Sequence, residues 1–225
     1  MLEWLGARPG VAAREESRIL LAAHRFLAEV DRFQALDDAR DDALHALRAA
    51  CLAYAMRDAP DSTRLLIEKE PLEPIALPAG DYAEFLSHVR SLYPGIRMIF
   101  MVRHPVAAVS SMRARQWGNS LTRASARSFS LDECITTWRA NAALAAQLAG
   151  HRLVLRCHYE ELVADPSAAS IRIADFLGLS GTPPFRPLPP RPSVLTPEEE
   201  LLVLERTAAE RHLLAGLPRG AAAGS

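Results

Sequence analysis

An arginine and a pair of serines in the stretch 97–112 are the side chains of this sequence that most clearly suggest chemistry. Arg103 follows an apolar run, Met98–Val102, and Ser110 and Ser111 lie further along, in a predicted helix that begins at Pro105. A guanidinium offers a planar fork of donors that suits phosphate, and helix N-termini favour anions. The spacing predicts a phosphate site, although an ion-paired surface arginine and two solvated serines would give the same pattern.

A second set of polar residues comes after another apolar run. Lys69 and Glu70 follow the run 65–67, separated from it only by Glu68. They should therefore lie at the carboxyl end of a strand, the edge where ligands bind in open α/β sheets. A solvated turn is the alternative interpretation of this pair.

Strands and helices are needed to bring these side chains together. The continuous apolar run 98–102 is typical of a parallel strand covered on both faces. Further strands are predicted over 65–68 and 153–157. With a helix over Tyr82–Leu92 between the first two strands, the segment forms a strand–helix–strand unit, normally a right-handed parallel crossover.

The other elements are predicted from apolar spacing and from capping signals. The helices expected are 2–7 (the end of a helix), 17–31, about 36–57, one beginning at Ser130, and a last one from Thr196 to about Leu214. We expect 117–130 to form an irregular flap and the proline-rich stretch 183–192 to form an extended linker.

Composition excludes several classes of protein. The chain has 225 residues, enough for one α/β domain, and a net charge of −1 argues against non-specific nucleic-acid binding. Cys51, Cys134 and Cys157 are predicted to be buried reduced thiols. No apolar stretch approaches the roughly 18 residues of a membrane span, and no metal-ligand spacing occurs. The start lacks the layout of a secretory signal, so we expect a cytoplasmic protein.

Three segments together resemble the sulfotransferase superfamily. The stretch 97–112 looks like its 3′-phosphate-binding element, in which a strand ends in Arg-x-Pro and a serine lies eight residues after the arginine, here Arg103 and Ser111. The segments 158–167 (HYEELVADPS) and 171–179 (IRIADFLGL) are similar to the Tyr-Glu-Asp-Leu element and its trailing helix. The segment 67–71 (IEKEP) resembles a Lys-Thr/Glu-Pro segment of bacterial members.

The resemblance implies a fold and a reaction. The fold is α/β, a three-layer parallel sheet flanked by helices of the P-loop NTPase-like sulfotransferase type. The reaction is transfer of a sulfuryl group from 3′-phosphoadenosine 5′-phosphosulfate (PAPS) to a hydroxyl or amine of a small-molecule acceptor, without a metal.

The same resemblance implies roles for five residues. Arg103 and Ser111 would hold the 3′-phosphate of the donor, and Tyr159 would lie near the nucleotide, although an aromatic packed at a strand end is an equal alternative. Lys69 would stabilise charge on the transferred group. Glu70, or as an alternative Glu73, would take the acceptor's proton. His24, His104 and His158 do not cluster, so surface or capping roles are expected for them, and Glu160 and Glu161 should cap or ion-pair.

One segment expected from the resemblance does not occur in this sequence. Relatives usually begin with a strand and a phosphate loop of the Pro-x-Ser-Gly-Thr-Thr type, whereas residues 1–10 resemble the helix and the turn that come after that loop. We favour a true start further upstream, because the other segments are intact. The alternative is a non-catalytic protein that binds a nucleotide or a partner only. A small-molecule kinase would need a phosphate-loop lysine and a carboxylate for Mg²⁺, and the sequence shows neither.

For domain organisation, we expect a single sulfotransferase-like domain over 1–217, followed by a disordered tail over 218–225. The acceptor would be a small molecule, and a homo-oligomer is compatible with the sequence.

Overall fold

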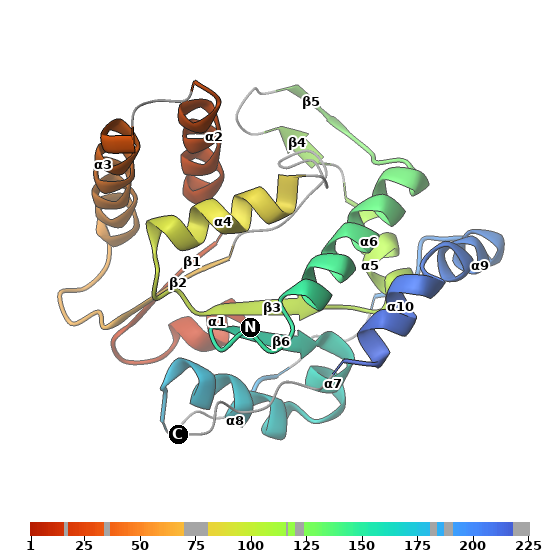
Figure 1. Cartoon of the computed structure of the whole chain (residues 1–225). Helices are drawn as coiled ribbons and strands as arrows, with labels where there is room; N and C mark the ends of the chain where they lie inside the picture. Colours follow the sequence, from red (N-terminus) through yellow and green to blue (C-terminus); the bar gives the residue numbers. More distant parts are fainter. Residues whose placement is uncertain are drawn as a thin grey trace. The chain divides into compact units, whose positions relative to one another are not determined.

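A computed structural model gives the fold in two compact units. It describes residues 1–15, 18–33, 37–69, 81–115, 117–119, 124–180, 184–186 and 191–217. The first unit comprises Met1–Leu72 and Ala83–Ile96, and the second comprises Glu73–Tyr82 and Arg97–Ser225. Both are mixed α/β units that contain a pair of parallel strands flanked by helices (Figure 1).

The first unit is built on the parallel pair β1–β2, in register from Val11 opposite Leu65 to Glu15 opposite Lys69. Three helices of this unit share an apolar cluster that contains Leu27, Leu44 and Leu92. The elements are α1 (Leu2–Gly6), β1 (Val11–Glu15), α2 (Ile19–Arg32), α3 (Asp37–Met56), β2 (Leu65–Lys69) and α4 (Tyr82–Leu92).

The second unit is built on the parallel pair β3–β6. Figure 1 shows α6 above this pair and α8 below it. Leu155, Arg156 and Cys157 are consecutive and all buried, as expected for a strand covered on both faces. The elements are β3 (Met98–Val102), α5 (Pro105–Arg113), β4 (Trp117–Asn119), β5 (Ala124–Arg127), α6 (Leu131–Gln147), β6 (Val154–His158), α7 (Tyr159–Ala164), α8 (Pro166–Leu177), α9 (Pro197–Arg206) and α10 (Ala208–Ala215).

Several elements agree closely with the sequence-based expectation. The predicted strand 98–102 and the predicted helix Tyr82–Leu92 have the observed bounds. The capping box at the start of α6 is present, because the Ser130 hydroxyl accepts from the Glu133 N–H and the Glu133 carboxylate accepts from the Ser130 N–H. All three cysteines are free and buried, which confirms that prediction.

Other expectations were wrong. The strand β1 was not predicted, because Val-Ala-Ala-Arg-Glu has little strand character by itself and becomes a strand through its pairing with β2. The expected flap contains a short antiparallel pair, β4–β5. The last helix is two helices, since α9 ends before Thr207 and α10 begins after it.

The crossover expected between β2 and β3 stays a prediction, because these strands belong to different units. The single domain expected over 1–217 stays a prediction too. The tail 218–225 and most of the proline-rich stretch lie outside the described residues. Among the helices that the structure describes, none is long and apolar enough to cross a membrane.

Candidate functional site

The register of β3 and β6 brings Arg103 next to Tyr159. The two strands are parallel, and their last paired residues are Val102 and His158. The chain therefore leaves both strands at the same edge, with Arg103 and Tyr159 as the next residue of each. The Arg103 guanidinium carbon lies 4.8 Å from the centre of the Tyr159 ring, a cation–π contact.

This contact leaves hydrogen-bonding capacity on Arg103. The Nε atom of Arg103 is buried and has no hydrogen-bond partner among the described residues. Buried donors are nearly always paired in folded proteins, because an unpaired donor has lost water without a replacement. A guanidinium that is stacked on an aromatic ring and carries such a donor is suited to bind an anion.

The two hydroxyls of α5 have different environments. Ser110 is buried, and its Oγ accepts a hydrogen bond from the Val194 N–H at 2.9 Å, so it holds the segment before α9. Ser111 is half-buried. The helix begins as expected, with His104 in extended backbone at the N-cap and Pro105 at the first helical position.

Lys69 and Glu70 are placed only in part. Lys69 is the last residue of β2, as expected, and its side chain is exposed. It belongs to the first unit, whereas Arg103 belongs to the second. Glu70 and Glu73 lie outside the described residues, so a charge-stabilising lysine and a carboxylate base stay predictions.

The carboxylates after Tyr159 have the structural roles that were expected for them. Glu160 accepts a hydrogen bond from the His104 N–H at 2.8 Å. Glu161 forms an ion pair with Arg172 of α8 at 3.3 Å.

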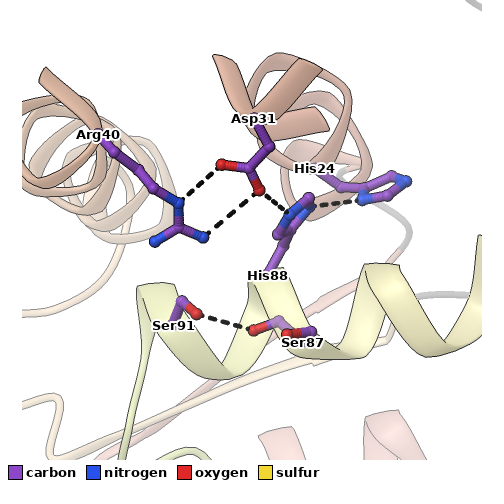
Figure 2. Close-up of polar contacts among 6 residues, drawn as sticks. All are labelled: His24, Asp31, Arg40, Ser87, His88 and Ser91. Atoms are coloured by element: carbon purple, nitrogen blue, oxygen red, sulfur yellow. Dashed lines mark hydrogen bonds and ion pairs between the residues drawn. The ribbon is translucent and has the colours of Figure 1, made fainter. Parts of the chain in front are cut away.

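For His24 a surface or capping role was expected, and that expectation was wrong. It is buried, and its Nδ1 lies 2.9 Å from the Nδ1 of His88, whose Nε2 lies 3.0 Å from Asp31 (Figure 2). Arg40 completes the row with a 2.7 Å hydrogen bond to Asp31. A signal was present in the sequence, since His24 comes four residues after Leu20 and three before Leu27, on the apolar side of its helix.

One further residue near Arg103 was not among the candidate site residues. The indole N–H of Trp138 in α6 donates to the Arg103 carbonyl at 2.8 Å. Within the part of the chain that the structure describes, no group of three His, Cys, Asp or Glu side chains could hold a metal ion.

These features define an α/β protein with parallel strands and, at the end of one strand, an arginine that is suited to bind an anion. Its sequence matches the model of the Sulfotransferase family over residues 3–184, so the chain belongs to that family. Among curated proteins, no sequence matches significantly.

Two solved structures are similar to this chain. One is the sulfotransferase domain from the curacin biosynthetic pathway, with 16% identity, 82% of this chain and 69% of that chain covered, and a TM-score of 0.49. The other is the sulfotransferase domain from the Synechococcus PCC 7002 olefin synthase, with 20% identity, coverage of 91% and 88% and a TM-score of 0.49.

Proposed function

We propose that this protein transfers a sulfuryl group from PAPS to a hydroxyl or amine of a small-molecule acceptor. Its family supports sulfotransferase chemistry. The choice of donor rests on one observation, the stacked Arg103 with its buried, unpaired Nε donor. A 3′-phosphate distinguishes PAPS from ordinary nucleotides, and a fork of donors at that place is suited to bind it.

In this proposal, residues of the second unit bind the donor. Arg103 and the Ser111 hydroxyl hold the 3′-phosphate. Tyr159 keeps the Arg103 guanidinium in place through the cation–π contact and lies beside the nucleotide. The donor supplies the sulfuryl group, and the protein supplies alignment and charge stabilisation, which are the main contributions to this kind of transfer.

Lys69 and Glu70, which follow one another in the sequence, have proposed catalytic roles. Lys69 lies at the carboxyl end of β2 and would stabilise the negative charge that develops on the transferred group. Glu70 would accept the proton of the acceptor hydroxyl or amine.

Calorimetry with 3′-phosphoadenosine 5′-phosphate tests the assignment of Arg103. Replacing a charge-assisted hydrogen-bond donor, as in Arg103→Ala, should weaken binding by about 1.5–3 kcal/mol, roughly 10- to 150-fold. Arg97→Ala is the matched control, because Arg97 precedes the same strand and donates to the Phe176 carbonyl. Equal affinity of the wild-type protein and Arg103→Ala would reject the proposed role.

A transfer assay separates an enzyme from a protein that only binds. A proton-accepting Glu70 predicts that Glu70→Gln retains nucleotide affinity while the rate of sulfuryl transfer falls by about 10²-fold or more. Nucleotide binding by the wild-type protein without any transfer would instead favour the non-catalytic alternative.

A further inference from the structure

A single peptide group between β3 and α5 is held at both of its polar atoms. Its carbonyl oxygen, that of Arg103, accepts from the Trp138 indole N–H at 2.8 Å. Its N–H, that of His104, donates to the Glu160 carboxylate at 2.8 Å. Because both atoms belong to one planar group, these two contacts fix the orientation of the plane as well as its position.

The two side chains that hold this peptide belong to helices of the second unit. Trp138 is 5% exposed and belongs to the apolar core of the second unit. Glu160 comes directly after Tyr159 at the start of α7. His104 precedes a proline and has the extended backbone that this position favours, with φ −49° and ψ 134°. Thus the chain on both sides of the peptide has little freedom.

The negative charge of Glu160 is unexpected so close to a proposed anion site. A carboxylate beside an anion site lowers the affinity for the anion through repulsion between like charges. Glu160 is one residue from Tyr159, on whose ring the Arg103 guanidinium is stacked. A role in holding the backbone accounts for a negative charge there, whereas a role in attracting the ligand does not.

We propose that Trp138 and Glu160 are positioning residues that preorganise Arg103 for the 3′-phosphate. This inference rests on the proposed function. Because its peptide plane is fixed, the Arg103 side chain starts from a fixed backbone position and extends to the Tyr159 ring. A guanidinium that is already oriented loses less conformational entropy when it binds a phosphate than one on a mobile backbone.

The test compares two nucleotides that differ only in the 3′-phosphate. Calorimetry gives the dissociation constants of 3′-phosphoadenosine 5′-phosphate and adenosine 5′-phosphate, and their ratio measures 3′-phosphate recognition. For Glu160→Ala, removal of a negative charge by itself would increase this preference, whereas loss of the backbone contact should decrease it. We expect a decrease of roughly three- to tenfold. A preference that is unchanged or stronger in Glu160→Ala would overturn the inference.

Three further variants sharpen the comparison. Glu160→Gln keeps an oxygen acceptor for the His104 N–H and removes the charge, so it should retain or increase the preference. Trp138→Phe removes the indole donor and keeps an aromatic ring in the core, so it should lower the preference like Glu160→Ala. Glu161→Ala is the matched control, because this carboxylate pairs with Arg172. Its preference should equal that of the wild-type protein, and an equal loss in Glu161→Ala would overturn the inference.

The behaviour of the wild-type protein separates the proposed function from the positioning role. If the wild-type protein does not prefer the 3′-phosphorylated nucleotide, the proposed function fails, and the positioning role fails with it. If the wild-type protein has the preference and Glu160→Ala and Trp138→Phe keep it at unchanged thermal stability, only the positioning role fails.

Discussion

Glu68 of the first unit has a half-buried side chain. Its Oε1 atom is buried without a hydrogen-bond partner among the described residues, and burial raises the pKa of the carboxyl. Arg14 is opposite Glu68 in the β1–β2 register and lowers this pKa in part. However, Arg14 also donates to the Ala55 carbonyl at 2.6 Å. Glu68 is therefore destabilising when it is ionised.

The first prediction concerns Glu68→Gln and pH. Since the folded-state pKa lies above the unfolded value of roughly 4.3, ionisation destabilises the fold as pH rises through the folded-state pKa. The neutral glutamine removes this effect, so urea unfolding should show a more stable variant at pH 8 and no gain near pH 4. Glu84→Gln, at an exposed position of α4, is the control. A gain that does not depend on pH would contradict this explanation.

Helices α2, α3 and α4 are joined by the row of polar side chains in Figure 2. His24 and Asp31 come from α2, Arg40 from α3 and His88 from α4. The Arg40 hydrogen bond is the main cause that lowers the Asp31 pKa, with a further lowering by His88. Because a carboxylate only accepts, His88 donates from Nε2, and in the neutral pair His24 donates from Nδ1 to the His88 Nδ1.

This geometry makes the His24–His88 contact important for the packing of the helices. The two Nδ1 atoms are 2.9 Å apart, so one ring donates its proton and the other accepts it. Both rings are buried, so removal of one partner leaves an unpaired polar atom in the other, at a cost of about 1–3 kcal/mol.

The variants His24→Asn and His24→Phe test this contact. The asparagine amide N–H can take the place of Nδ1 as a donor to His88, whereas phenylalanine has no polar atom. We expect His24→Asn to be more stable than His24→Phe, as measured by urea unfolding. Equal stability of the two variants would refute the importance of the hydrogen bond.

The core of the second unit joins elements that are far apart in the sequence. Its buried cluster contains Val102 of β3, Ile135 of α6, Val203 of α9 and Leu214 of α10. Ion pairs add to this packing, since Arg139 of α6 binds Glu210 of α10 at 2.7 Å. The helices after the proline-rich stretch are therefore part of the core that supports Trp138 and the Arg103 peptide.

Ile135→Ala should destabilise this core strongly. Ile135 is fully buried in the cluster, so its truncation loses burial and leaves a cavity, at a cost of about 2–5 kcal/mol. The same change at Ile171, which is 59% exposed on α8, is the matched control and should cost less than about 0.5 kcal/mol. Chemical denaturation measures both values. Similar losses in the two variants would argue against the core described here.

The sequence by itself determined the elements whose pattern is local. The run Met98–Val102 predicts its strand because five consecutive apolar residues fit a strand buried on both faces. Ser130 and Glu133 predict the start of α6, because a capping box is contained within one turn. The resemblance to the family could also be recognised from the sequence, because each of its characteristic segments is a short continuous stretch of residues.

The tertiary structure alone decided which distant residues meet. β1 is a strand because it pairs with β2, which lies about 50 residues further along the chain. The Arg103–Tyr159 contact depends on the β3–β6 register. The Trp138 hydrogen bond to the Arg103 carbonyl and the His24–His88 contact depend on helix packing. Neither register nor packing is encoded in a local pattern, because both arise from the free energy of the whole core.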